Sequence, residues 1–589
     1  MASQRPRRQI KKRVPWEAES VITLQKTPLS RASARRDVLN EALKPIAASQ
    51  IQLTNTFPSK LPVYDPPLRL QPEKGRGLGK GPTQLATFQN FISDAAVAQI
   101  VTATNIYAAE HRDAENEGHY RLWHDTNFEE IIRYLGCLIY MGLHIERNSA
   151  EYWSETHNLG RFLGKQRYEQ IHRYFTLRDT PQRSNDQFFW KLEPVASLIR
   201  SACQSNFIPG SHLAVDEAMV AFRGRTNDIL KIKNKPIKEG YKVWVLAEKG
   251  YVWSFLWHSN EFGIEDIPKK GLTVPRNLDS SSSVHLAPTF ALVIILARHL
   301  RLIYPSKIFC FFLDNLFLNI DVACALLSLH ILTMGTTRKN AKGMPQELVH
   351  IKNNYNKSLV WDSTLARIVD SVLCFLWQDN NVVLGMTTAY SLHDRVLRER
   401  KRPSLTSTNA CIVRPVFGDA VKKQLFIPTA IDAYNHHMNG VDLNNQLRLR
   451  MTVCRPFERR TWRPLWNWLL DICCVNAFLI WQGDQQDLGH RAHRQFRRSL
   501  CDQLLSYSQK DSSSLGHYWS SFKKRNFCIW CKKHTEDYQP RKRRKFGTEI
   551  DGNARFRGVS CLGGCKAWAS IYAERGPVSS DITVSVDKT

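Results

Sequence analysis

The feature that most constrains the fold is a continuous apolar run, KIFCFFLD, at residues 307–314. Its length suits one strand, and its lack of polar alternation is typical of a strand that is buried on both faces. Strand-like runs precede it at 212–222 and 241–258, and a segment with an early proline and a late positive charge, typical of a helix, follows Pro288. Strands, a helix and a buried strand in this order predict an α/β core.

Helical patterns lie on both sides of this core. Residues 88–110 and 128–143 carry apolar residues at three-to-four spacing, and helices are expected again from 430 to about 510. A chain of 589 residues exceeds the roughly 250 to 300 residues that one core serves, so several domains are expected. A basic, serine-rich segment at 395–408 is expected to be a loop.

The charge of the chain indicates its class of partner. Lys and Arg number 82 against 54 Asp and Glu, a net charge of +28, which favours a polyanion such as nucleic acid. The longest apolar stretches, such as 472–481, fall short of the roughly 20 residues that span a bilayer, so no membrane partner is expected. The 14 cysteines, mostly single and in apolar surroundings, favour a reducing compartment.

Three aspartates stand out, two of them next to apolar strand-like runs and the third in a segment with helical spacing. Asp216 lies in LAVDEAMVAFRGR, Asp314 ends the buried run, and Asp442 lies in YNHHMNGVDLNNQLRLR. Phosphoryl transfer on DNA uses two divalent cations held by hard oxygen ligands, so carboxylates are the residues to seek. Each aspartate also has a structural interpretation, as an edge-strand residue, a helix N-cap and a partner of a helix dipole, respectively. A metal site requires that the three meet in space.

These three segments, in this order, closely resemble the signature blocks of piggyBac-family DDE transposases. The resemblance extends through NKPIKEGYKVWVLAEKGYVWSFLW and TWRPLWNWLLDICCVNAFLIW and covers about 88–501. It implies an RNase H-like catalytic domain with an insertion, a flanking split all-helical dimerisation and DNA-binding domain, and a small C-terminal cysteine-rich zinc module. In such enzymes the three aspartates, here Asp216, Asp314 and Asp442, hold two Mg²⁺ ions.

The resemblance also implies a reaction. A homodimer excises the element through hairpin ends and joins it to TTAA targets. The alternative is a domesticated, transposase-derived DNA-binding protein that has lost catalysis. The predicted domains are 1–80, disordered and basic; 81–210, helical domain, first part; 211–345, catalytic domain, first part; 346–425, insertion; 426–450, catalytic domain with the third aspartate; 451–515, helical domain, second part; and 525–570, a degenerate zinc module.

One position departs from the family pattern. Many members carry a fourth carboxylate three residues after the third aspartate, where this chain has Asn445. Residues three apart on a helix share a face, and an amide brings no charge to a cation. This departure predicts reduced or lost transposition, unless Asn445 is an ordinary exposed polar residue.

Basic side chains close in sequence to the aspartates are candidates for phosphate contacts, although charge runs are also common on solvated surfaces. Trp462, which follows Arg455 in a second basic group, could stack on an unpaired base or pack in the core. The DNA-binding candidates are Arg223, Arg225, Lys235, Arg338, Lys339, Lys342, Arg455 and Trp462.

The C-terminal cysteines have the spacing of a metal site. Cys528 and Cys531 form one half of a tetrahedral zinc site, and Cys561 and Cys565 could supply the other half. One Zn²⁺ is expected, in a module with fewer ligands than the family's. The basic runs RKRRK at 541–545 and RPRRQIKKR near the N-terminus predict a nuclear location, or else contact DNA phosphates.

Overall fold

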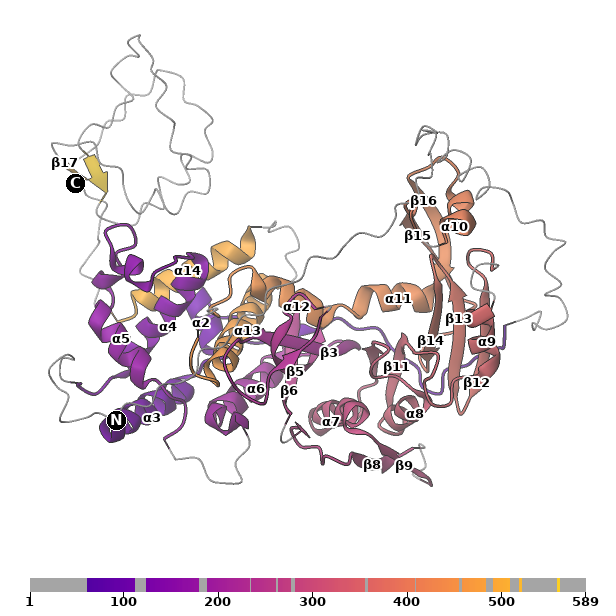
Figure 1. Ribbon diagram of the computed structural model, residues 1–589, viewed down its shortest axis with the longest axis horizontal. Coiled ribbons are helices and arrows are strands. Elements are labelled where there is room, and N and C mark those ends of the chain that lie inside the picture. The colour runs from indigo at the N-terminus through magenta and orange to yellow at the C-terminus, as the bar shows by residue number, and fades with distance from the viewer. Residues whose placement is uncertain are drawn as a thin grey trace, which may run out of the picture.

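The computed structural model is a mixed α/β protein with one large sheet (Figure 1). It describes residues 61–111, 123–179, 188–233, 235–260, 263–276, 281–354, 359–407, 409–454, 458–483 and 491–508, together with the strands at 519–521 and 559–561. The sheet runs from the middle of Figure 1 to its right-hand side, and helices from the early and late parts of the chain gather at the left. The predicted α/β class is confirmed.

The large sheet has the strand order β12-β13-β14-β11-β10-β3-β5-β6-β7, with β4 beside β5. Strand β10 is parallel to both of its neighbours, and the other pairs are antiparallel. The strands are β3 (His212–Ala221), β4 (Leu230–Lys231), β5 (Glu239–Glu248), β6 (Tyr251–Ser259), β7 (Gly263–Ile264), β10 (Phe309–Leu313), β11 (Ile331–Thr336), β12 (Thr364–Val369), β13 (Val372–Gln378) and β14 (Val382–Thr387).

Strand β10 is buried on both faces, as its sequence predicts. Phe309, Phe311 and Leu313 join the core that includes helices α7 (Pro288–Ile303) and α8 (Ile320–Ser328). Cys310 and Phe312 join a second core on the other face, which includes α11 (Thr429–His437). Every residue of β10 therefore leaves water, which explains why residues 309–313 are all apolar.

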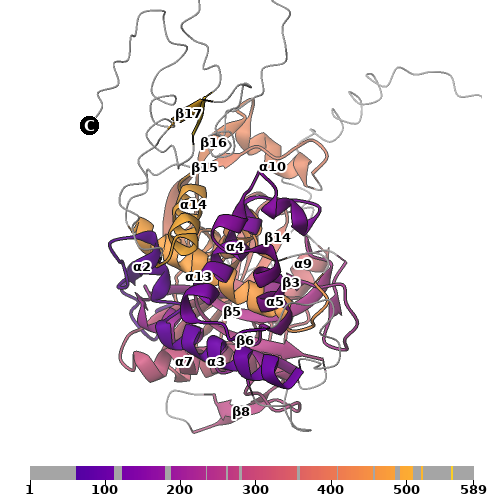
Figure 2. The ribbon, with the colours of Figure 1, turned by 90° about the vertical axis from the view of Figure 1, so that its left-hand side faces the viewer.

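The helical part combines segments that are far apart in the sequence. Helix α14 packs against α4, and α13 packs against α2 (Figure 2). Helix α4 begins and ends where the sequence predicts. The helices are α2 (Gln84–Gln89), α3 (Asp94–His111), α4 (Phe128–Leu143), α5 (Lys165–Tyr174), α6 (Val195–Ser205), α13 (Arg463–Gln482) and α14 (Ala492–Leu505).

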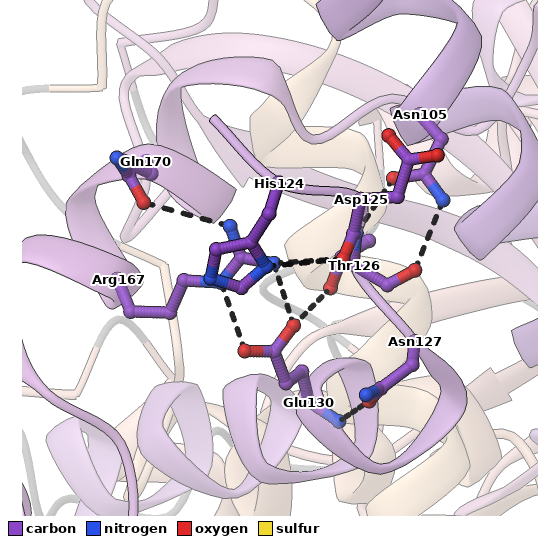
Figure 3. Close-up of polar contacts among 8 residues, drawn as sticks. All are labelled: Asn105, His124, Asp125, Thr126, Asn127, Glu130, Arg167 and Gln170. Carbon is purple, nitrogen blue, oxygen red and sulfur yellow. Dashed lines mark hydrogen bonds and ion pairs between the residues drawn. The ribbon is translucent and has the colours of Figure 1, made fainter. Parts of the chain in front are cut away.

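A polar network fixes the beginning of α4 against α5 (Figure 3). The Asn127 side chain accepts a hydrogen bond from the Glu130 backbone N–H at 2.9 Å and so caps the helix. The Glu130 carboxylate accepts from Arg167 Nε at 2.8 Å and Nη2 at 2.6 Å, a bidentate pair between the two helices. This network explains why α4 starts at Phe128.

Helix α13 corrects one prediction about length. By length and composition alone its 20 residues could cross a membrane, although no stretch of that kind is expected from the sequence. In the structure 89% of its apolar window is buried, because the helix packs against β6, α2 and α6. Its hydrophobicity is that of a core helix.

Residues 346–425, the predicted insertion, contribute β12, β13 and β14 to the large sheet. A separate ribbon follows, made of β15 (Arg395–Lys401) and β16 (Lys422–Pro428). The loop predicted at 395–408 is therefore wrong for its first seven residues, because RVLRERK is charged and largely exposed and so lacks an apolar alternation.

The remaining short elements are β1 (Arg76–Gly77), η3 (Ser149–Trp153), η4 (Leu159–Arg161), η5 (Phe188–Leu192), β2 (Phe207–Ile208), β8 (Leu272–Pro275), β9 (Ser283–Leu286), α9 (Gln346–Asn354), α10 (Ala410–Phe417), α12 (Gly440–Leu449), β17 (Trp519–Ser521) and β18 (Val559–Cys561).

Candidate active site

The first two aspartates lie at one edge of the sheet. Strands β3 and β10 are parallel neighbours, and their register pairs Val215 with Leu313. The next residue in each chain segment is an aspartate, Asp216 in β3 and Asp314 just after β10. Parallel strands that advance together bring successive residues side by side, so both carboxylates leave the sheet at the same place.

Helix α12 brings the third aspartate to the same strand. At its start, a Cβ on Gly440 would lie 2.9 Å from the Ala247 carbonyl oxygen and 3.4 Å from the Ala214 Cβ, so the helix lies directly on β5 and β3. Near its end, Arg448 Nη2 donates to the Met219 carbonyl at 3.1 Å. These anchors on β3 lie on either side of Asp216, so Asp442, in the first turn, lies over that part of the strand.

Burial and neighbouring charges both act on Asp216. Partial burial raises the pKa of Asp216 to about 6, and the negative charges of Asp442 and Glu217 add to the rise. The Glu217 backbone N–H, which donates to Asp216 Oδ1 at 2.7 Å, and the Lys235 ammonium oppose it. Asp216 and Asp442 are thus near enough to repel each other.

A second charged cluster adjoins the aspartates. Glu217 is buried and contacts Lys235 at 3.1 Å and Lys242 at 2.6 Å. Burial raises the pKa of Glu217, but the two ammonium groups outweigh it and hold that pKa below its usual value. The Lys235 pKa lies above its usual value because Glu217, Asp216 and Asp442 outweigh the effect of burial. The predicted DNA-binding residue Lys235 therefore lies beside the carboxylates of Glu217, Asp216 and Asp442.

Asp314 has its own polar neighbours. Thr336, the last residue of β11, donates to Asp314 Oδ1 at 3.3 Å and lies 3.2 Å from the Tyr434 hydroxyl of α11. On the other side, Arg338 Nε donates to the side chain of Asn315 at 3.1 Å. Arg338 is therefore beside the residue that follows Asp314.

Asn445 lies on α12 beside Arg448, the residue that bonds this helix to β3. Its side chain is half-buried, and its amide oxygen accepts from Arg448 Nη2 at 3.3 Å. Arg448 is 1% exposed. Asn445 thus contacts a buried guanidinium group, and its role at the fourth position stays a prediction.

The fit of the site to divalent cations rests on its topology and charge. Across the described ranges, no three His, Cys, Asp or Glu side chains are arranged so that they could hold a metal ion. The three aspartates nevertheless share one edge of the sheet, and the repulsion between Asp216 and Asp442 is the kind that a bound cation would relieve. Carboxylate oxygens are the donors that Mg²⁺ prefers.

The other predicted contacts are placed as follows. Arg223 and Arg225 are exposed after β3, whereas Lys339 contacts Asn353 and Lys342 pairs with Asp321 at 2.9 Å. Trp462 is 5% exposed, and its ring lies parallel to that of Phe175 at 6.2 Å, which fits the core-packing alternative.

Several predicted residues lie outside the described part of the chain. These are Arg455, Cys528, Cys531, Cys565 and both basic runs; of Cys561 only the backbone, in β18, is described.

The structure adds functional candidates that sequence reasoning missed. Glu217 follows Asp216 and pairs with Lys242 across β3 and β5, Thr336 contacts Asp314, and Arg448 holds α12 on β3. Glu217 had one available signal, a second carboxylate next to Asp216 within an apolar strand. The others carry none, because their roles depend on strand register.

Comparison with known proteins places this fold. The family model described as Transposase IS4 matches residues 83–478, more than half of the chain. The chain therefore belongs to the Transposase IS4 family, as a piggyBac-type member.

Two human relatives match about three quarters of the chain. PiggyBac transposable element-derived protein 3 is 22% identical over 443 residues, or 73% of this chain and 64% of the relative. The Chimeric ERCC6-PGBD3 protein is also 22% identical over 443 residues, which cover 36% of that protein. The chain thus spans less than two thirds of the length of either relative. A solved structure, the cryo-EM piggyBac transposase synaptic complex with hairpin DNA, has a TM-score of 0.56 and 18% identity, covering 75% of this chain and 86% of that chain.

Proposed function

We propose that the chain is a piggyBac-like cut-and-paste DNA transposase that excises an element and joins it to TTAA targets. The observation that supports this proposal is that Asp216 and Asp314 lie in or directly after neighbouring parallel strands, with α12, which carries Asp442, packed on β3, in a member of a transposase family. The sheet order is β6-β5-β3-β10-β11, in which only the pairs β3 with β10 and β10 with β11 are parallel. This order supports an RNase H-like catalytic domain.

The aspartates would hold two Mg²⁺ ions, which when bound activate the attacking oxygen and stabilise the leaving oxygen of a phosphoryl transfer. The protein's own residues position the DNA. Lys235 stands beside Asp216 and Arg338 beside Asn315, so a phosphate entering between them meets a cation on either side of the carboxylates. Thr336 orients Asp314 by donating to it.

The partners follow from the same proposal. The net charge of +28 suits DNA, and the solved relative's title names a synaptic complex with hairpin DNA. We propose that the helical part, with its separate N-terminal and C-terminal helices, serves DNA binding and homodimerisation. A sedimentation measurement that finds only monomers, with and without DNA, would argue against the dimer.

Two accessory features stay proposals. One Zn²⁺ on Cys528, Cys531, Cys561 and Cys565 would stabilise the C-terminal module; equal zinc content in the full chain and its Cys528→Ser variant would exclude this site. The basic runs would direct the chain to the nucleus. Unchanged nuclear accumulation after both runs are deleted would rule that out.

The test of the proposed reaction is excision. If terminal repeats and TTAA duplications flank the gene, a marker placed between those repeats is expected to be excised in cells that express the chain. Asp314→Asn should abolish excision, because the family's chemistry needs all three carboxylates. Binding to the repeats without excision would favour the alternative, a domesticated DNA-binding protein, for which Asn445 is the specific supporting residue.

A further inference from the structure

Two basic cavities adjoin on the surface between the sheet and the helical part. The first, of about 750 Å³, is lined by the connection after β3, including Arg223, Arg225 and Lys231. The second, of about 520 Å³, lies between α3, η5 and the start of α13. Thr461 lines both cavities, so they lie on either side of this residue.

The second cavity, which we call the Lys191 pocket, has an excess of cations. Arg178, Lys191, Arg459 and Arg460 line it, against the carboxylates of Glu110 and Asp179. The Lys191 ammonium and the Arg178 guanidinium each lie 5.5 Å from the centroid of the Trp190 ring, so the cations gather over one aromatic surface.

Lys191 is the informative member of this group. It is half-buried, and burial lowers its pKa, with a further contribution from the charge of Arg460. No carboxylate in the described ranges forms an ion pair with Lys191. A partly desolvated cation that faces other cations is unfavourable unless an anion enters.

The neighbouring arginines divide into two roles. Arg460 donates to the backbone carbonyls of Phe175, at 2.9 Å, and Arg173, so it is fixed in the fold and contributes charge only. The Arg459 side chain is exposed at the rim of the pocket. Lys191 and Arg459 line the same pocket, so an anion that enters it could contact both.

We propose that the Lys191 pocket binds a backbone phosphate of the DNA strand on which the carboxylate site acts. The strand would run along the two cavities, past Thr461, toward the cations that follow β3, the strand that carries Asp216. A cation-lined groove with aromatic side chains is the usual form of a strand-tracking surface. This inference rests on the proposed function for the identity of the polyanion.

The test compares charge-removing variants of the full chain. The two pocket variants are Lys191→Gln and Arg459→Gln. Arg459 is exposed at the rim, so its substitution leaves the fold intact. The control is Lys165→Gln, at an exposed lysine of α5 that lies 3.9 Å from Glu169. Affinity for duplex DNA of mixed sequence is measured from low to moderate salt. Each contact to one phosphate contributes about 0.9 to the slope of log affinity against log salt.

We expect the slope to fall by about one in Lys191→Gln and in Arg459→Gln and to be unchanged in Lys165→Gln. Slopes in both pocket variants equal to that of Lys165→Gln would overturn the proposal. A second probe replaces chloride by inorganic phosphate at equal ionic strength. If phosphate stabilises the natural chain but not Lys191→Gln, while all DNA slopes agree, the pocket takes a small phosphate and the strand proposal is wrong.

The outcome separates this pocket from the proposed function. Altered slopes in a chain that binds DNA without excising it would retain the pocket and reject the transposase reaction. If the pocket variants have the slope of Lys165→Gln and the chain excises its element, the pocket is rejected and the transposase reaction is retained.

Discussion

Asp471 offers the clearest test of how the helical part is held to the sheet. This α13 residue is fully buried, accepts from Arg497 Nη1 at 3.1 Å and from Thr452 Oγ1 at 2.5 Å, and faces a second buried guanidinium group, that of Arg448. Burial raises the pKa of Asp471, and the two guanidinium groups oppose the rise. One carboxylate thus balances two cations, one of which fixes α12 on β3.

Asp471→Asn keeps the shape of the side chain but removes the only negative charge among these three groups. Removing one partner of a buried ion pair costs about 3 to 5 kcal/mol, and because the amide oxygen can still accept hydrogen bonds we expect about 3 kcal/mol. With a urea dependence of about 3 kcal/mol per molar, the unfolding midpoint should fall by about 1 M.

The assay is urea unfolding followed by tryptophan fluorescence, since Trp466 and Trp468 are buried in α13 near Asp471. Asp419→Asn, at an exposed position before β16, is the matched control and should shift stability by less than about 0.5 kcal/mol. An Asp471→Asn midpoint equal to that of the control would refute the argument that Asp471 balances the buried cations.

Three further predictions concern pH, packing and the fourth position. Burial and two neighbouring guanidinium groups lower the pKa of His172 to about 3, below its unfolded value of about 6.5, so the unfolded chain takes up the proton first. The contribution of His172 to the free energy of unfolding is complete above pH 6.5 and falls by about 2 kcal/mol at pH 5. His172→Gln should therefore reduce the difference between the urea midpoints at pH 7 and pH 5. Gly440→Ala would press a methyl group against the Ala247 carbonyl, and it should weaken Mn²⁺ binding and excision together by shifting α12. Asn445→Asp should form a charge-assisted bond to Arg448, raise the unfolding free energy by about 1 kcal/mol and increase excision; excision equal to that of the natural chain would show that the fourth position does not limit activity.

The sequence predicted elements whose signals are local. Helix α4 is found at its predicted bounds because a capping asparagine and an apolar stripe mark it, and β10 because a strand covered on both faces has no polar residues. The exposed strand β15 was missed, since its charged residues satisfy no apolar pattern. The length of the apolar helix α13 was underestimated. This helix is apolar all round because it is packed on every side inside the protein, and not because it crosses a membrane.

The candidate site was predictable as a list of residues and not as a geometry. Asp216, Asp314 and Asp442 were candidates because of their sequence surroundings. The sequence could not show the parallel register of β3 with β10 or the packing of α12 on β3 and β5, which place these residues at one edge of the sheet. The contact of Glu217 with Lys235 and Lys242 joins residues brought together by β5. No local pattern encodes such contacts.

The central claim is that the three aspartates form one cation site, and a titration of the full chain with Mn²⁺, followed by electron paramagnetic resonance, tests it most directly. The natural chain should bind up to two ions, Asp216→Asn, Asp314→Asn and Asp442→Asn should each weaken that binding at least tenfold, and Asp419→Asn should leave it unchanged. Equal Mn²⁺ binding by the natural chain and the triple asparagine variant would contradict the claim.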